Sequence, residues 1–299
     1  MIACNRVSHA GIWWMDGTFS SNPAIFVQLY TVHVKCNDEF VVQLWCLLPE
    51  KTGPTYDRLF RLLKQKAAQL NLPLQPIAIH VDFEQAVIQA IRTHFGIEPS
   101  GCLFHFSQSI LRHLGQAGLQ VAYNTNAPPE IRKLVRRMMA MALIPPVRID
   151  QALQALTASA QNVVGYVVEC DAMIQYMRHT YIDPNALFQR PLWNCFGQMN
   201  RTTNVCEGYH HIINEKFRRG RPDPFQFVNF LQEQQADIER RVAQLQVGAP
   251  PRKRKAAYVH VDDALERLRN QYFGARIPNV AGLLQYMDAV AHQMYDVKH

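Results

Sequence analysis

Apolar and polar positions in the first third of the chain alternate between strand-like and helix-like patterns. Apolar runs of strand length cover residues 12–15, 24–35, 39–48 and 77–81. The second and third runs are joined by Cys36-Asn37-Asp38, a composition typical of a hairpin turn. Residues 55–71 instead repeat apolar side chains at helical spacing. A helix reaching Phe95 and a short strand near Gly101–Phe104 are expected next, so the order predicts a mixed α/β sheet.

From about Phe106 the pattern becomes helical. Helical runs separated by prolines cover residues 130–141, 148–158 and 163–177. Residues 181–200 are irregular, helical periodicity resumes at Val205, and Asp223-Pro224 has the composition of a helix start. The best linker is the basic stretch Gly248–Lys255, and two helices are expected after it, around 261–273 and 280–295.

These patterns divide the chain into four parts, with a large all-α insertion in an α/β (α+β mixed-sheet) core. The expected parts are a strand-rich core at 1–105, a helical insertion without strands at 106–200, a return to the core at 201–247, and a linker with C-terminal helices at 248–299.

The composition is that of a globular protein, with 48% hydrophobic and 18% charged residues among 299. The net charge of +7 permits binding to a polyanion such as nucleic acid but does not require it. Seven cysteines at irregular spacing indicate a reduced, intracellular protein. We find neither a signal-peptide pattern nor an apolar run that could cross a bilayer, so we expect no membrane partner.

Three acidic residues lie where chemistry is expected. Asp16 ends the first predicted strand, Asp82 ends the fourth, and Glu207 lies in the first turn of a later helix. Three carboxylates on rigid elements suit two Mg²⁺ or Mn²⁺ ions about 3.5–4 Å apart. Structural roles remain open at this point. Asp16, which precedes Gly17, could be a turn residue, and Asp82 could cap the helix that follows it. Glu207 could form a capping box with Asn204.

The helix of Glu207 has two distinct faces. Its predicted apolar stripe is Val205, Tyr209, Ile212, Ile213 and Phe217, and its polar face is Glu207, His211, Asn214 and Arg218. The polar face fits an active-site groove, and it fits solvent equally well.

Four motifs follow one another in a specific order. They are Asp16-Gly17-Thr18-Phe19, Val81-Asp82-Phe83-Glu84, Gly101-Cys102-Leu103-Phe104-His105-Phe106, and Arg201-Thr202-Thr203-Asn204-Val205-Cys206-Glu207-Gly208-Tyr209-His210. Together they resemble the successive signatures of Mutator-like transposases. The resemblance extends to less diagnostic stretches at 47–52, 191–194 and 283–286, and so covers nearly the whole chain.

The resemblance implies a ribonuclease-H-like fold with a helical insertion before the third acid, and cut-and-paste DNA transposition with divalent metal. Asp16, Asp82 and Glu207 match the family's three metal-binding acids. Strands one and four are neighbours in such a sheet, so we expect the three carboxylates within about 4–8 Å of one another, sharing two Mg²⁺ or Mn²⁺ ions. The expected partner is DNA, as transposon ends and target, with no small-molecule substrate. A nuclear location is expected, and a homo-oligomer is compatible with this function.

Cys102 and His105 form the family's C-x-x-H element. They supply half of a zinc site at best, and Cys206 with His210 is one conceivable other half. We favour a different arrangement, in which His105 lies near the reacting phosphates as a hydrogen-bond donor and Cys102 packs in the core.

Basic residues cluster at 132–137, 216–221 and 252–255. Such clusters often only face solvent and bind nothing, but the second cluster directly follows the helix of Glu207. We therefore expect phosphate contacts from Lys216, Arg218, Arg219 and Arg221. The third cluster resembles a nuclear localisation signal. Trp193 is a candidate for stacking on an unpaired base, although a core or lid role is the stronger expectation.

The sequence departs from the family pattern in two places, and the first departure favours an alternative function. Members of the family commonly carry a zinc-binding DNA-recognition module upstream, and fifteen residues precede Asp16 here. Val81 also stands where a small hydroxyl residue is usual. The alternative is a catalytically silent, transposon-derived protein that binds DNA or a protein partner, whereas retention of all three acids favours an active transposase.

Overall fold

The computed structural model describes residues 11–198, 201–274 and 278–295, and the chain divides into two compact units. Unit 1 contains residues 1–102 and 202–253, and unit 2 contains residues 103–201 and 254–299. Cys4 lies outside the described residues, and none of the other six cysteines is in a disulfide bond. Within the described part of the chain, no helix has both the length and the apolar character needed to span a bilayer.

Unit 1 is built on a five-stranded sheet in the order β3-β2-β1-β4-β5. Its strands are β1 (Ile12–Thr18), β2 (Gln28–Cys36), β3 (Glu39–Leu48), β4 (Ala78–Val81) and β5 (Ser100–Gly101). β2 pairs antiparallel with β1 and with β3, whereas β1, β4 and β5 are parallel to one another. The predicted mixed sheet is confirmed.

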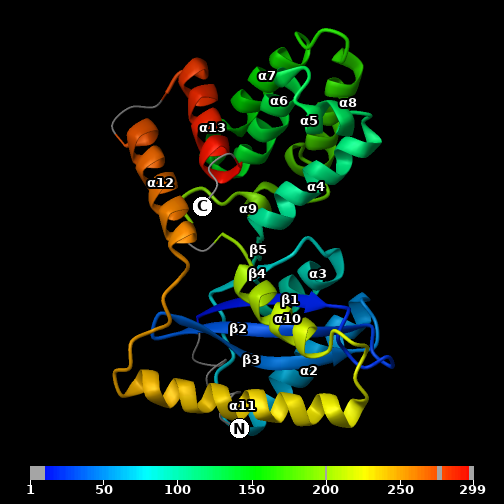
Figure 1. Ribbon diagram of the computed structural model, residues 1–299, viewed down its shortest axis with the longest axis vertical. Coiled ribbons are helices and arrows are strands. Elements are labelled where there is room, and N and C mark those ends of the chain that lie inside the picture. Colours follow the sequence, from blue (N-terminus) through cyan, green and yellow to red (C-terminus); the bar gives the residue numbers. More distant parts are fainter. Residues whose placement is uncertain (1–10, 199–200, 275–277, 296–299) are drawn as a thin grey trace. The chain divides into compact units, whose positions relative to one another are not determined.

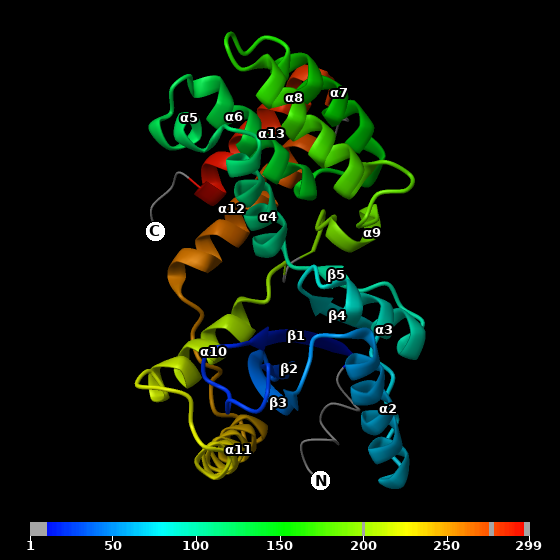
Figure 2. The same cartoon turned by 90° about the vertical axis from the view of Figure 1, so that its right-hand side faces the viewer.

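Helices cover both faces of this sheet, which explains why its central strand is apolar on both sides. Trp13, Trp14 and Met15 of β1 are all buried. On one face lie α10 (Asn204–Lys216) and α11 (Pro224–Gln246), and on the other lie α2 (Gly53–Gln69) and α3 (Gln85–Phe95), as Figure 1 and Figure 2 show. The Asp223 side chain caps α11 by accepting hydrogen bonds from Phe225 N and Gln226 N, so the predicted helix start is confirmed.

The β2–β3 connection is the expected hairpin. Asn37 and Asp38 both have positive φ, 44° and 67°, as a two-residue turn between twisted strands requires. The first of the two strands begins at Gln28, later than predicted. Residues 23–26 form a turn instead, closed by a 3.0 Å hydrogen bond from Phe26 N to Pro23 O.

The strand expected at Gly101–Phe104 is wrong beyond Gly101. Helix α4 (Leu103–Gln116) begins immediately after β5, because Leu103, Phe106, Ile110 and Leu114 recur at helical spacing and are buried.

Unit 2 is helical, with no strand among its described residues. Besides α4, its helices are α5 (Gln120–Thr125), α6 (Pro129–Ala140), α7 (Ile149–Ala160), α8 (Val167–Met177), α9 (Arg190–Trp193), α12 (Ala256–Phe273) and α13 (Val280–Tyr295). Short 3-10 turns cover Met141–Leu143 and Pro146–Arg148, and a π-helical turn covers Arg178–Ile182. Because α13 packs against α6, α7 and α12, the two closing helices belong to the same unit as residues 103–201.

Candidate active site

Asp16 lies inside β1, is buried, and is part of the strand pairing. The prediction that the strand ends at Asp16 is wrong, because Asp16, Gly17 and Thr18 all pair with β2. Gly17 serves close packing and not a turn, since a Cβ on it would lie 2.4 Å from Gln28 Oε1. The Asp16 carboxylate accepts a hydrogen bond from Gly17 N at 2.8 Å. The acid is therefore held on a rigid element.

Asp82 directly follows β4, the parallel neighbour of β1. Trp14 of β1 pairs with His80 of β4 in parallel register. Asp16 and Asp82 each lie two residues further on, so they occupy corresponding positions along these two neighbouring segments. Adjacent strands lie about 4.8 Å apart, and corresponding residues of adjacent strands share a face. Asp82 Oδ1 accepts a hydrogen bond from Glu84 N at 3.2 Å, so the carboxylate also supports the turn that leads into α3.

Glu207 lies in the first turn of α10, which follows Thr203. No side chain caps this helix end, so the capping-box role weighed for Asn204 and Glu207 is absent here.

The buried face of α10 differs from the predicted apolar stripe. Cys206, His210 and Ile213 are buried, whereas Ile212 is 53% exposed. Ile213, Tyr209 and Phe217 of the predicted stripe do pack in or against the core. The prediction missed His210, whose polar side chain is buried through its contacts with the sheet and not through its hydrophobicity. Asn214, from the predicted polar face, accepts hydrogen bonds from Ser20 and Ser21 and so ties α10 to the segment after β1.

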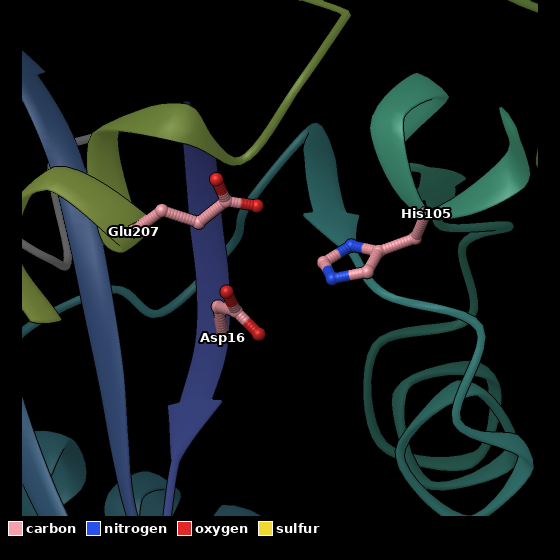
Figure 3. A group of neighbouring side chains, drawn as sticks. All are labelled: Asp16, His105 and Glu207. Carbon is pink, nitrogen blue, oxygen red and sulfur yellow. The ribbon is translucent and has the colours of Figure 1, made fainter. Parts of the chain in front are cut away.

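Asp16 and Glu207 meet in space although they are far apart in sequence. A carboxylate oxygen of one lies within 4.8 Å of a carboxylate oxygen of the other. Figure 3 shows the Asp16 side chain on β1 and the Glu207 side chain on α10, with both carboxylates facing the same space. Among the described residues, Asp82 does not form a three-residue group with them at that spacing. The structure thus brings two of the three predicted acids together and leaves the third at the end of the adjacent strand.

The C-x-x-H element crosses the boundary between the units. Cys102 is buried in unit 1, where its N–H donates to Val81 O at 2.8 Å and its Sγ accepts from Thr203 N at 3.3 Å. His105 lies in the first turn of α4, which belongs to unit 2.

The conceivable zinc site gains no support from unit 1. Within the described parts of the chain, no cysteine belongs to a cluster of three metal-ligand side chains. Burial, together with the nearby charge of Asp16, raises the pKa of the Cys206 thiol well above its usual value.

Buried polar side chains surround Asp16 on the inner side of α10. His210 Nε2 lies 2.9 Å from Thr31 Oγ1, and His210 Nδ1 lies 3.9 Å from Asp16 Oδ2. His33 Nε2 lies 3.2 Å from the same hydroxyl. Burial lowers the pKa of His210 to about 4, and burial with the proximity of His210 lowers the pKa of His33 to about 3. Both imidazoles are therefore neutral at pH 7.

Thr31 and His33 are two residues of the site that were not predicted from the sequence. A weak signal was present, because positions 31 and 33 are polar and share one face within a strand whose residues 29–34 are all buried. His210 occurred in a recognised motif, but its burial against Thr31 depends on tertiary packing.

The predicted phosphate-binding residues form a cationic turn after α10. Lys216, Arg218, Arg219 and Arg221 line a concave surface of about 490 Å³. Arg221 donates a hydrogen bond to Phe19 O at 3.2 Å. The turn is therefore fastened to the segment that follows β1, the strand of Asp16.

The basic cluster of α6 and the indole of Trp193 have structural roles in unit 2. Arg137 donates two hydrogen bonds to Asp288, at 2.6 and 2.7 Å. Trp193 has no exposed surface, stacks on Phe106 with ring centroids 5.3 Å apart, and donates from Nε1 to Tyr181 O at 2.8 Å. These contacts match the core role for Trp193 and leave no ring face open for a base.

The linker cluster is also engaged within the separate units. Arg252 N donates to Glu39 Oε2 at 2.9 Å in unit 1, and Arg254 pairs with Asp262 at 2.6 Å in unit 2. Two of the four basic residues thus have acidic partners, so the linker is tied at both ends.

Unit 1 is therefore a mixed α/β domain that brings an acidic residue of its central strand close to one of helix α10 and carries a cationic turn after that helix. Residues 12–109 match the family model of the MULE transposase domain, from β1 into α4, and the match includes Asp16, Asp82, Cys102 and His105. The match confirms the resemblance to Mutator-like transposases over this part of the chain. The domain indicates a transposase-related function with DNA as a partner. No curated protein matches the chain.

Proposed function

We propose that this protein is a DNA transposase that cleaves and joins DNA strands with two divalent cations, Mg²⁺ or Mn²⁺, held by Asp16, Asp82 and Glu207. The observation that carries the proposal is the approach of the Asp16 and Glu207 carboxylates to within 4.8 Å on two rigid elements. Like charges held this close in a partly buried site favour a cation between them.

The donor set fits a hard divalent cation. Mg²⁺ holds its oxygen ligands about 2.1 Å away, so two oxygens on one ion lie at most about 4.2 Å apart. Small side-chain rotations of Asp16 and Glu207 bring a 4.8 Å spacing into this range. When bound, a pair of such ions activates an attacking oxygen and stabilises the leaving oxygen in phosphoryl transfer.

Asp82 completes the acidic set from the adjacent strand. The parallel register of β1 and β4 supports its place beside Asp16. Release of its hydrogen bond to Glu84 N would free the carboxylate for a cation. The strand order, in which β1 and β4 are neighbours and only β2 runs antiparallel to the rest, supports a ribonuclease-H-like core.

His105 is assigned to the same site as a hydrogen-bond donor to the reacting phosphates. Cys102 is fixed in unit 1 by Val81 and Thr203. Three residues of chain span at most about 11 Å, so the Cα of His105 stays within that distance of Cys102. The tether therefore limits how far His105 can lie from Cys102, the residue that follows β5.

The DNA backbone would bind at the cationic turn. Lys216, Arg218, Arg219 and Arg221 offer charge without base-specific geometry, which suits phosphate contacts. The proposal places the protein in the nucleus, consistent with the exposed basic run 252–255.

Cleavage of nicked or branched DNA in Mg²⁺ or Mn²⁺ tests this function. We expect Glu207→Gln to lower the cleavage rate more than about 100-fold, because loss of a direct ligand exceeds the 10–100-fold cost typical of outer contacts. Glu215→Gln is the matched control, since Glu215 is exposed on the same helix. Equal rates for the two variants would overturn the metal-ligand role of Glu207. DNA binding without cleavage by the wild type in either metal would instead support the catalytically silent alternative.

A further inference from the structure

Thr31 occupies the position directly opposite Asp16 in the antiparallel pairing of β1 and β2. Its hydroxyl oxygen is 2.9 Å from His210 Nε2, 3.2 Å from His33 Nε2 and 3.3 Å from the Asp16 carbonyl oxygen. All four side chains are at least nine-tenths buried, so water does not compete for these contacts. A single hydroxyl thus connects two imidazoles beside a proposed metal ligand.

Proton counting gives this group a direction. The Thr31 hydroxyl has one proton, and the shortest of its three contacts is the one to His210 Nε2. The contact to the Asp16 carbonyl, at 3.3 Å, is longer than an ordinary O–H···O hydrogen bond. The arrangement that gives this proton to the shortest contact has Thr31 donating to His210 Nε2 and accepting from His33 Nε2–H. The reverse direction would need the other tautomer of both rings. A neutral His210 that accepts at Nε2 carries its proton on Nδ1.

We infer that His33, Thr31 and His210 form a directional hydrogen-bond relay whose last donor, His210 Nδ1–H, orients the Asp16 carboxylate for cation binding. The inference rests on the proposed function, in which Asp16 is a metal ligand. His210 Nδ1 lies 3.9 Å from Asp16 Oδ2, and a shift of about 1 Å makes this contact a hydrogen bond. His210 and Thr31 are thus positioning residues that act through Asp16.

Such a relay would hold both carboxylate oxygens of Asp16 by protein contacts. Asp16 Oδ1 accepts from Gly17 N at 2.8 Å, and Oδ2 faces His210. Both contacts limit rotation of the carboxylate, so its remaining lone pairs point in one direction. Outer hydrogen bonds of this kind orient metal ligands, and their loss typically costs about 10–100-fold in metal affinity.

Two substitutions of Thr31 separate a relay from simple packing. Thr31→Val keeps the shape of the side chain and removes the hydroxyl, whereas Thr31→Ser keeps the hydroxyl and removes a methyl group. If Thr31 only fills space, the valine variant is the milder change. If Thr31 relays a hydrogen bond, the serine variant is the milder one.

The test uses the full chain and two readouts besides cleavage. The first is the ¹⁵N NMR signature of the His210 tautomer in metal-free protein, assigned by its loss in His210→Asn. The second is Mn²⁺ affinity, measured by electron paramagnetic resonance titration. We expect the Nδ1–H tautomer, Mn²⁺ affinity about 10-fold or more weaker in Thr31→Val, and affinity within about threefold of wild type in Thr31→Ser. Thermal melting of both variants shows that they are folded.

Each contrary result has a defined meaning. An Nε2–H tautomer of His210 would overturn the relay direction, because His210 would then donate to Thr31 and its Nδ1 would have no proton for the Asp16 carboxylate. Valine and serine variants with equal Mn²⁺ affinity would overturn the orienting role. A wild type that binds Mn²⁺ no better than Asp16→Asn would overturn the proposed function and the metal-orienting role with it, while the tautomer still decides the direction of the relay.

Discussion

Unit 1 and unit 2 are comparable in length but bury different kinds of side chain. Among the described residues, twelve buried polar or charged side chains lie in unit 1, and two, Ser107 and Asn194, lie in unit 2. The core of unit 2 consists instead of aliphatic and aromatic contacts, such as Trp193 stacked on Phe106.

This difference indicates where function resides. A buried polar group costs free energy unless its hydrogen bonds are satisfied, so a fold accumulates such groups where something other than stability is gained. Asp16, Thr31, His33 and His210 form one such group on the face of the sheet covered by α10. Unit 2 has the pattern of a stable helical scaffold, and unit 1 has the pattern of a site.

The largest expected effect is on DNA cleavage, and it is tested with two separate variants that each lose one acidic residue, one in unit 1 and one in unit 2. Asp16→Asn should lower metal-dependent DNA cleavage more than about 100-fold with little change in melting temperature, because it removes a direct cation ligand. Asp288→Asn in unit 2 removes the partner of Arg137, so it should lower stability and leave cleavage per folded molecule unchanged. Cleavage rates and melting curves of both variants provide the comparison. A large loss of cleavage in Asp288→Asn would place function in unit 2 as well.

DNA affinity gives the next largest effect. Replacing Lys216, Arg218, Arg219 and Arg221 with glutamine should weaken binding to unrelated duplexes equally, because phosphate contacts carry no base information. For every phosphate that is no longer neutralised, the slope of log affinity against log salt should become shallower by about 0.9. The variant with four glutamines at 252–255 should change the slope less, since Arg252 and Arg254 already have acidic partners. DNA titrations of both variants at several salt concentrations measure the two slopes. An unchanged slope for the variant at 216–221 would show that the cationic turn does not contact DNA.

Trp193 tests the scaffold role of unit 2. Trp193→Ala should lower the free energy of unfolding by about 3–5 kcal/mol, as expected for a fully buried aromatic side chain. Trp193→Phe keeps a ring against Phe106 and should preserve DNA affinity. Denaturant unfolding and DNA titration measure the two quantities. Weaker DNA binding by the well-folded phenylalanine variant would show that the indole contacts DNA.

Local signals in the sequence predicted much of the fold but only part of the site. The hairpin at Asn37-Asp38 and the helix start at Asp223-Pro224 depend on neighbouring residues, and both are observed. The continuation of β1 beyond Asp16 was missed, because Gly17 reads as a turn residue until Gln28 is seen packed against it.

The inner part of the site could not be predicted for a related reason. The contacts among Thr31, His33 and His210 join a strand and a helix that are distant in sequence. No local pattern specifies such a network, since polar residues in an apolar strand are uncommon but not diagnostic. The approach of Glu207 to Asp16 was predicted only through the family resemblance, because the spacing in sequence fits several structural roles.

The smallest effect concerns Glu39, a buried acid of unit 1 that lies outside the proposed site. Glu39 begins β3 and accepts hydrogen bonds from Arg241 Nη2 at 2.6 Å and Arg252 N at 2.9 Å. Burial by itself raises the pKa of this carboxyl, but the hydrogen bonds and charges of Arg241 and Arg252 outweigh burial and lower the pKa overall. The contacts fasten α11 and the start of the linker to the edge of the sheet.

A carboxyl with a lowered pKa stabilises the folded state above its unfolded pKa of about 4.3, and this contribution is lost as the pH falls through the folded value. We therefore expect Glu39→Gln to lower the free energy of unfolding by about 1–3 kcal/mol at pH 7, and by progressively less below about pH 4. Denaturant unfolding between pH 3 and pH 7 measures this difference in the free energy of unfolding. Asp38→Asn is the neighbouring control. A smaller loss is expected for it, because solvent screens the exposed ion pair of Asp38 with Lys35. Cleavage per folded molecule should not change, because Glu39 supports structure and not the acidic site. A loss of cleavage without a loss of stability would show that the edge of the sheet also belongs to the functional part of unit 1.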